Sequence, residues 1–255
     1  MPDPKILVRP PPPSFCNAIS PHPEKDTIDY NLALKQHEEF VCALQQAGAE
    51  VEALPPLADF PDSGFIEDNA LVLEGRIFLC SMKAESRRGE PAHLLPRLQQ
   101  TADVEKIEPP VFIDGGDVIE TETTVYIGQS HRTGPEAINF FKTRLKKSVV
   151  PVTVSGILHL KTGASYLGDG TFLVNPAGCD WKQFEARDCL KVMPSEAYAA
   201  NSLTVGRNVL LPAGFEDTKN KVENAGYRVL PVPMSEFEKA DGGLTCLHLK
   251  LTTTT

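Results

Sequence analysis

Positive charge, paired cysteines and long apolar runs are all scarce in this sequence of 255 residues. Lys and Arg number 25 against 34 Asp and Glu, so the formal net charge is -9, which repels nucleic acids and acidic membrane surfaces and attracts small cations. No apolar run approaches the roughly 20 residues of a membrane span, and residues 1–5 do not begin a secretion signal. We therefore expect a soluble, cytoplasmic protein that binds neither nucleic acid nor membrane.

The six cysteines include no close C-x-x-C pair, and a chain of this length needs no disulfide framework. We therefore expect reduced thiols. A small buried apolar position is the usual place of a cysteine, and that is the default interpretation of Cys16, Cys42, Cys80, Cys179 and Cys189. Cys246 differs because it closes the segment ADGGLTC (240–246), whose glycines let a ligand approach the backbone.

One pattern, two apolar strands followed by an amphipathic stretch and a short third strand, occurs four times. The strand pairs are residues 65–80, 112–128, 158–175 and 200–211. A spacing of roughly 40 to 47 residues between their starts indicates a stacked or radial repeat. A fifth unit forms if residues 243–251 combine with 5–9 and 30–54 from the other end of the chain. The sequence thus predicts one α/β domain over residues 1–255, with five units closed into a propeller-like ring.

Three helices are predicted from apolar spacing and end signals. The first begins near Tyr30 and stops at Gly48, the second opens at Pro135, and Asp180 caps the third. Their inward side chains are expected to be Tyr30, Leu34, His37, Val41 and Leu44 in the first, Ile138, Phe141 and Leu145 in the second, and Trp181, Phe184 and Leu190 in the third.

Residues 10–29 are rich in proline, beginning with the run Pro10–Pro13. Proline excludes regular helix here and leaves a loop of about twenty residues. A loop of this length is either a lid over a functional site or a disordered segment, and both interpretations stay open. Residues 252–255 are expected to be a frayed end.

Four chemically capable residues occupy the starts of equivalent strands: Asp68, Asp114, His159 and Cys246. In a ring of equivalent units such positions converge on the axis. Cysteine, histidine and carboxylate are the parts of a covalent hydrolase, because a thiolate attacks, an imidazole carries protons and an acid holds the imidazole in one tautomer. We therefore interpret the chain as an enzyme.

Each of these residues also has a structural interpretation. A lone strand histidine is usually a hydrogen-bonded core residue, and the turn at Asp114 could be a tight bend in water. The acid pair Glu67 and Asp68 interrupts an apolar strand, which costs desolvation energy unless a cation or donor meets the carboxylates. A guanidinium fits that need, being planar, always charged and bidentate.

Five ordered segments resemble the dimethylarginine dimethylaminohydrolases, members of the guanidine-modifying superfamily. The segments are FIED (65–68), DGGDV (114–118), GQSHRT (128–133), LHLK (158–161) and LTC (244–246). The resemblance implies the pentein fold, a five-bladed α/β propeller of ββαβ modules around a central channel. It also implies hydrolysis of asymmetric dimethylarginine and N-monomethylarginine to citrulline plus dimethylamine or methylamine, through a covalent cysteine intermediate and without cofactor or metal.

The same resemblance implies a role for individual residues. Cys246 would be the nucleophile, His159 the general acid and then base, and Asp114 the carboxylate that orients His159. The implied substrate-binding residues are Asp62 for the ammonium, Glu67 and Asp68 for the guanidinium, Arg87 (with Arg88 as a rival) and Arg132 for the carboxylate, and Ile19 and Ala240 for backbone contacts.

Two departures from the family pattern, Asn69 and the proline-rich loop, leave the substrate preference open. The runner-up activity is an arginine or agmatine deiminase, which uses the same thiol chemistry and loses ammonia. A different class is a non-catalytic ring that binds a partner, like a ribosome-subunit anti-association factor. Lack of the thiol, imidazole and acid would have favoured that class. The expected partner is a small cationic guanidino substrate, and a homodimer is an open alternative to a monomer.

Overall fold

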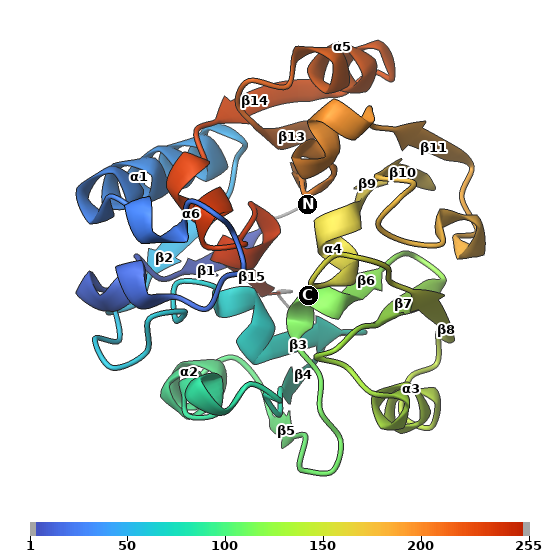
Figure 1. The fold of residues 1–255 in the computed structure, drawn as a ribbon. Helices are drawn as coiled ribbons and strands as arrows, with labels where there is room; N and C mark the ends of the chain where they lie inside the picture. The colour runs from blue at the N-terminus through green and yellow to red at the C-terminus, as the bar shows by residue number, and fades with distance from the viewer. Residues whose placement is uncertain (1–3, 252–255) are drawn as a thin grey trace.

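The computed structural model describes residues 4–251 and arranges them as a ring of five small sheets (Figure 1). The frayed end expected at residues 252–255 lies outside the described residues. The strands are β1 (Lys5–Val8), β2 (Glu50–Ala53), β3 (Ala70–Leu73), β4 (Arg76–Leu79), β5 (Val104–Lys106), β6 (Val118–Glu120), β7 (Thr124–Gln129), β8 (Ser148–Thr153), β9 (Ala164–Gly168), β10 (Thr171–Val174), β11 (Asp188–Lys191), β12 (Leu203–Val205), β13 (Asn208–Pro212), β14 (Arg228–Val232) and β15 (His248–Leu251).

Helices surround and connect these strands. The α-helices are α1 (Tyr30–Gln46), α2 (Glu90–Leu98), α3 (Pro135–Lys142), α4 (Leu160–Gly163), α5 (Glu216–Asn224) and α6 (Ser235–Lys239). The short 3-10 helices are η1 (Pro13–Asn17), η2 (Lys25–Thr27), η3 (Ile66–Asn69), η4 (Glu85–Arg87), η5 (Gly115–Asp117), η6 (Trp181–Gln183), η7 (Pro194–Ala200) and η8 (Thr245–Leu247).

Every blade has the same construction. Its inner strand pairs antiparallel with the middle strand, and the outer strand pairs parallel with the middle one. A parallel pair needs a crossover connection, which α1, α2, α3 and α5 supply at the rim of the ring (Figure 1) and η6 supplies in the third blade. The predicted pentein fold, an α/β propeller of ββαβ modules, is therefore confirmed.

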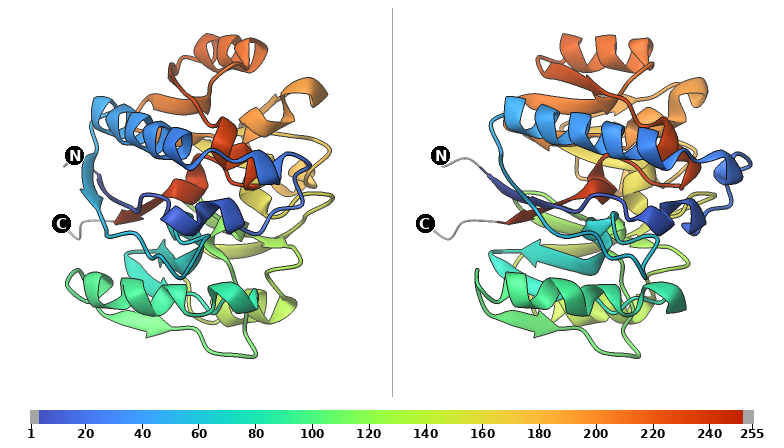
Figure 2. Two further views of the ribbon diagram at one scale, coloured as in Figure 1. Left: turned by 60° about the vertical axis from the view of Figure 1, so that its left-hand side comes forward. Right: turned by 90° about the vertical axis from the view of Figure 1, so that its left-hand side faces the viewer.

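The fifth blade is made from both ends of the described chain. Strand β1 pairs antiparallel with β15, from Lys5 opposite Leu251 to Val8 opposite His248, and parallel with β2. The two ends of the described chain accordingly lie on the same side of the ring (Figure 2). This pairing closes the ring, as the sequence predicts.

A short helical turn precedes each inner strand: η3, η5, α4, η7 and η8. Asp68 lies in η3, Asp114 and His159 are the N-caps of η5 and α4, and Cys246 lies in η8. The sequence-based placement of the acid pair at 67–68 in a strand was wrong, because these residues form the turn ahead of β3. One turn is too short to show a helical period in sequence.

The core is divided into apolar clusters between neighbouring blades. One of them joins α1, α6 and the inner face of the fifth blade, with Phe15, Phe65 and Phe237 in mutual edge or tilted contact. Phe15 belongs to the 10–29 loop, so its burial ties that loop to the ring. No helix within residues 4–251 is long and apolar enough to cross a bilayer.

Two of the three predicted helices are present, with differences in each. The prediction of Leu145 in the second was wrong, because α3 ends at Lys142, and α1 buries a shifted face. In α1 the buried side chains include Ala33, His37, Phe40 and Leu44, whereas Leu34 is only half-buried. The Asp29 side chain accepts the N–H groups of Asn31 and Leu32 and so caps the start of α1, a role that apolar spacing alone does not predict.

The helix predicted after Asp180 was wrong. Only the 3-10 turn Trp181–Gln183 forms, the Asp180 side chain does not cap it, and Leu190 lies in β11. Phe184 stacks on Phe172 with ring centroids 4.4 Å apart and planes 6° apart. This tertiary contact directs the segment across the third blade and overrides its helical propensity.

The 10–29 loop contains η1 and η2 separated by irregular backbone, in agreement with the exclusion of regular helix. The backbone N–H of Ile19 donates to Asp62 at 3.1 and 3.3 Å. The loop therefore lies against a predicted substrate-binding residue, which favours the lid interpretation.

Candidate active site

Three side chains from three blades converge near the ring axis. One ligand-type atom each of Asp68, Asp114 and His159 lies within 4.8 Å of the others, and all three residues are buried. They come from the turns η3, η5 and α4, which stand at equivalent places in their blades. The repeat geometry thus brings together residues that are remote in sequence.

Asp114 orients both an imidazole and a guanidinium through one oxygen. His159 Nε2 lies 3.0 Å from Asp114 Oδ2, and Arg132 Nη1 lies 3.3 Å from the same atom. Since Nε2 faces the carboxylate, Nδ1 is the ring nitrogen left for proton transfer. Burial alone would lower the pKa of His159, but the negative charge of Asp68, the hydrogen bond to Asp114 and the charge of Asp117 outweigh it and raise that pKa to about 9.

Two glycines make the close approach of η5 to its neighbours feasible. A Cβ on Gly116 would stand 2.9 Å from two atoms of the His159 ring, and a Cβ on Gly115 would stand 2.0 Å from the carbonyl oxygen of Glu67. Any side chain at either position would push these turns apart. The glycine pair inside DGGD is therefore required by packing around the imidazole.

Cys246 lies in η8 and is 9% exposed. Its Sγ accepts the N–H of Gly243 at 3.4 Å, and Asn201 holds the preceding residue, Thr245, by bonds of 3.0 and 3.2 Å. Burial, together with the negative charges of Glu67 and Asp68, raises the pKa of the Cys246 thiol above its usual range. The thiol of the unliganded protein is therefore protonated at neutral pH.

Arg87 is buried and already bound to protein groups. Its Nη1 donates to Asp68 Oδ2 at 2.7 Å, and its Nε and Nη2 donate to Glu90 at 2.9 and 2.8 Å. Nη2 also donates to the carbonyl of Phe65 at 3.0 Å. A guanidinium has five N–H groups, so Nη1 keeps one for a ligand. The rival, Arg88, is half exposed and pairs with Glu85.

Replacing Arg87 with alanine is expected to lower the free energy of unfolding by about 3–5 kcal/mol, because Asp68 and Glu90 would keep buried charges without a partner. Arg88→Ala is the matched control and should change it by less than about 0.5 kcal/mol, since that side chain lies at the surface. Urea unfolding followed by circular dichroism measures both. Equal midpoints for the two variants would contradict this view of Arg87.

Asp62 and the lid residue Ile19 meet at the edge of the site. Asp62 is buried, and this burial raises the pKa of its carboxyl to about 6 despite the charge of Arg87. The Ile19 side chain is exposed, so its contribution to the contact is its backbone N–H. Ala240 is the buried C-cap residue that follows α6, just before Asp241, which has a positive φ of 57°.

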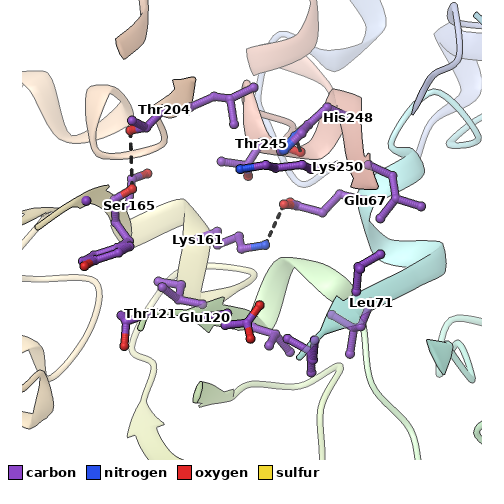
Figure 3. Close-up of a pocket in the computed structure, with 18 of the residues that line it drawn as sticks. Glu67, Leu71, Glu120, Thr121, Lys161, Ser165, Thr204, Thr245, His248 and Lys250 are labelled. Atoms are coloured by element: carbon purple, nitrogen blue, oxygen red, sulfur yellow. Dashed lines mark hydrogen bonds and ion pairs between the residues drawn. The ribbon is translucent and has the colours of Figure 1, made fainter. Parts of the chain in front are cut away.

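Glu67 lies next to Asp68 in η3, and its side chain also lines a cavity within the ring. Its Oε1 accepts from Lys161 Nζ at 2.6 Å, and its Oε2 has no hydrogen-bond partner among the described residues. Figure 3 shows the two side chains facing each other across the cavity, below Thr245 and His248. The cavity has a volume of about 510 Å³ and is lined by the inner strands of all five blades. The ion pair therefore forms part of the wall of this cavity.

A metal ion is a poor fit to the converging carboxylates. Asp68 already accepts from Arg87 and from the N–H of Gly116 at 2.9 Å, and Asp114 accepts from Arg132. The charges of the two guanidinium groups oppose a divalent cation there. The arrangement is instead suited to a cationic substrate beside a thiol, an imidazole and acids.

The family was identified by comparison with known proteins. The family model described as N,N dimethylarginine dimethylhydrolase, eukaryotic, matches residues 14–167. An N(G),N(G)-dimethylarginine dimethylaminohydrolase of Pseudomonas aeruginosa is 36% identical over 87% of this chain and 89% of its own length. The chain belongs to the dimethylarginine dimethylaminohydrolase family. It is a hydrolase that acts on guanidino C–N bonds.

Solved structures of this family match almost the whole chain. A cysteine-to-serine variant of the Pseudomonas aeruginosa enzyme complexed with citrulline has a TM-score of 0.91 and 32% identity, covering 98% of this chain and 100% of its own. A histidine-to-glycine variant of a dimethylarginine dimethylaminohydrolase, an adduct with S-methyl-L-thiocitrulline, has a TM-score of 0.89, 32% identity and the same coverage. The predicted pentein fold and family are both confirmed.

Three residues bond to the predicted site residues or to the loop that carries Arg132, although no role was predicted for them: Glu90, Lys161 and Asp117. Lys161 and Asp117 stand inside the LHLK and DGGDV segments, so their place in a motif was the available signal. Glu90 offered none, because its pairing with Arg87 depends on how η4 turns into α2.

Proposed function

We propose that this dimethylarginine dimethylaminohydrolase converts asymmetric dimethylarginine and N-monomethylarginine to citrulline plus dimethylamine or methylamine, with Cys246 as nucleophile. The observation that supports this most is the joining of His159 and Arg132 on one oxygen of Asp114, in a cluster with Asp68, whose negative charge also acts on Cys246. The same set of residues is thereby suited both to transferring a proton and to binding the carboxylate of an amino acid.

In this proposal the substrate is held by charge at each end. Arg132, with the remaining N–H of Arg87, binds the carboxylate. Asp62 binds the ammonium, aided by backbone groups of Ile19 and Ala240. Asp68 and the open oxygen of Glu67 face the guanidinium. Because agmatine has no carboxylate, it would leave the arginines unused and bind more weakly.

The chemistry begins when the bound guanidinium lowers the pKa of Cys246. Its positive charge offsets the burial and the two acids that keep the free thiol protonated. The thiolate attacks the guanidinium carbon, and His159 gives its proton to the departing amine, which leaves a cationic thiouronium on sulfur. His159 then removes a proton from water, the hydroxide adds to the same carbon, and collapse restores the thiolate and releases citrulline.

Citrulline release tests the proposal directly. Purified protein is incubated separately with asymmetric dimethylarginine, N-monomethylarginine, arginine and agmatine, and the products are identified by mass spectrometry. We expect citrulline from the two methylated substrates, with dimethylamine or methylamine in equal amount. Faster turnover of arginine or agmatine would assign a deiminase, and no product from any substrate would favour the non-catalytic ring.

The chain is proposed to be a single catalytic domain. Residues 4–251 expressed alone should therefore release citrulline from the same substrates.

The raised pKa of His159 predicts how stability depends on pH. A histidine with a folded pKa of about 9 and an ordinary pKa of 6.5 stabilises the fold fully below pH 6.5, and this contribution is lost as the pH rises through 9. The urea midpoint of the wild type should therefore fall between pH 7 and pH 9.5. The midpoint of His159→Asn should fall less over the same range. If the urea midpoints of the two proteins change with pH in the same way, His159 is not charged in the folded wild type.

A further inference from the structure

A second buried carboxylate, Asp117, lies behind the catalytic cluster and connects separate segments. It is fully buried. Its Oδ1 accepts the N–H of Leu160, the residue after His159, at 2.9 Å, and its Oδ2 accepts the hydroxyl of Ser130 at 2.6 Å. One side chain thus bonds to the backbone beside the imidazole and to the loop that carries Arg132.

Ser130 extends this connection to Arg132. Its oxygen accepts the N–H of Arg132 at 3.0 Å and the N–H of Thr133 at 3.3 Å. Thr133 in turn accepts the N–H of Asp114 through its hydroxyl at 3.4 Å. The loop at 130–133 is therefore tied at one end to Asp117 and at the other to Asp114.

Packing keeps the Asp117 carboxylate in place. A Cβ on Gly128 would stand 2.6 Å from Asp117 Oδ1 and 2.7 Å from Leu160 Cβ. Only glycine at 128 leaves room for the carboxylate to lie between β7 and the start of α4.

We propose that Asp117 is a positioning residue that holds His159 and Arg132 in register around Asp114, so that proton transfer and carboxylate binding depend on the same buried group. The proposal rests on the roles proposed above for His159 and Arg132. Asp117 itself touches neither substrate nor the reacting atoms. It acts through two hydrogen bonds and through its charge.

The hydrogen-bond directions require a carboxylate at this position. Ser130 Oγ receives two N–H groups and so uses both of its lone pairs, which leaves its own proton to be donated. Leu160 N–H is also a donor. Asp117 must therefore accept at both oxygens. An asparagine could accept at only one, and its NH₂ would oppose either the Leu160 N–H or a hydroxyl with no free lone pair.

The charge of Asp117 adds a second effect on His159. The acidic groups around the imidazole are Asp68 in η3, Asp114 before η5, Asp117 in η5 and Asp241 after α6. Arg132 is bonded to the same oxygen of Asp114 as the ring. Removing one negative charge from this set favours the neutral ring. Loss of Asp117 should therefore change both the position and the protonation of His159.

Three variants separate these effects: Asp117→Asn, Ser130→Ala and, as a control, Asp103→Asn. Asp103 is an exposed residue before β5. Asp117→Asn is expected to lower kcat by about 10- to 100-fold, the loss that a small misplacement of a catalytic group causes. It should also lower the pKa of His159, measured by NMR without substrate. Ser130→Ala frees the Arg132 loop and keeps the charge, so it should raise KM several-fold and leave that pKa near its wild-type value. Asp103→Asn should change none of these.

The double variant Asp117→Asn with Ser130→Ala tests whether the two residues act as a unit. Alanine removes the hydroxyl that would oppose the asparagine NH₂, so the combined loss in kcat/KM should be smaller than the product of the separate losses. Circular dichroism and the urea midpoint establish that each variant is folded. If Asp117→Asn does not fold, Ser130→Ala alone decides, and an unchanged KM overturns the proposal.

The proposal is also overturned if folded Asp117→Asn has the kcat, KM and His159 pKa of the wild type. It is likewise overturned if the loss in kcat/KM of the double variant equals the product of the two separate losses. The proposed function fails in a different way. If the wild-type protein does not hydrolyse methylated arginines but Asp117→Asn still shifts the His159 pKa, the positioning role is supported and the substrate assignment is wrong.

Discussion

Replacing Cys246 with serine is expected to abolish citrulline formation, with a loss in kcat of at least about 10³-fold. A serine hydroxyl is far less acidic than a thiol, so a bound guanidinium beside it would not produce an anion at neutral pH. The substitution changes size little at a buried position, and Gly243 N–H still finds an acceptor. The variant should therefore fold and bind substrate while turning over almost none.

The matched control is Cys42→Ser, because Cys42 is an exposed free cysteine on α1. It should retain wild-type kcat and KM. Ultraviolet absorption of the thiolate gives an independent measurement: an unreactive guanidinium ligand should increase it at pH 8 in the wild type and in Cys42→Ser, but not in Cys246→Ser. Normal turnover by Cys246→Ser would end the covalent mechanism.

Replacing His159 with asparagine is expected to lower kcat by about 10²- to 10⁴-fold, the range of general acid–base catalysis. Both halves of the proposed reaction need the ring: the departing amine needs a proton, and the attacking water must lose one. Asparagine can still donate a hydrogen bond to Asp114, which limits the structural disturbance. Product formation should therefore fall much more than substrate binding.

S-methyl-L-thiocitrulline separates the two halves, because its thiolate leaving group needs less help from an acid than an amine does. With this substrate, His159→Asn should form the covalent adduct on Cys246 and release it slowly, so intact-protein mass spectrometry should detect the adduct. His131→Asn, at an exposed position, should turn over normally. Rapid citrulline release by His159→Asn would show that another group activates the water.

The ring was predictable because its evidence is periodic. Equivalent strand pairs recur along the chain, and their motifs place Asp114 and His159 at equivalent positions, where the structure brings them to 3.0 Å. Four complete units and a partial one at each end of the chain predicted that residues 5–9 and 243–251 belong to one blade. The pairing of β1 with β15 agrees with this prediction.

The electrostatic arrangement was not predictable from spacing. The pairing of Glu67 with Lys161, and the hold of Glu90 on Arg87, depend on the direction of side chains at turns of only three or four residues. A buried charge needs a partner within hydrogen-bond distance, and spacing along the chain does not show which way a side chain at such a turn points. The helix predicted after Asp180 is absent for a similar reason, because the stacking of Phe184 on Phe172 determines the path of that segment.

Closure of the ring through β1 and β15 has a consequence for the order of assembly. The turn that carries Cys246 directly precedes β15, whose antiparallel neighbour is the first strand of the described chain. During synthesis the blades that carry His159 and Asp114 can fold before β15 has paired with β1. Until that pairing forms, the turn that carries Cys246 is not held in place. Contacts so remote in sequence form slowly. Recovery of turnover during refolding should therefore lag behind recovery of secondary structure, because the pairing of β1 with β15, which positions the thiol of Cys246, forms last.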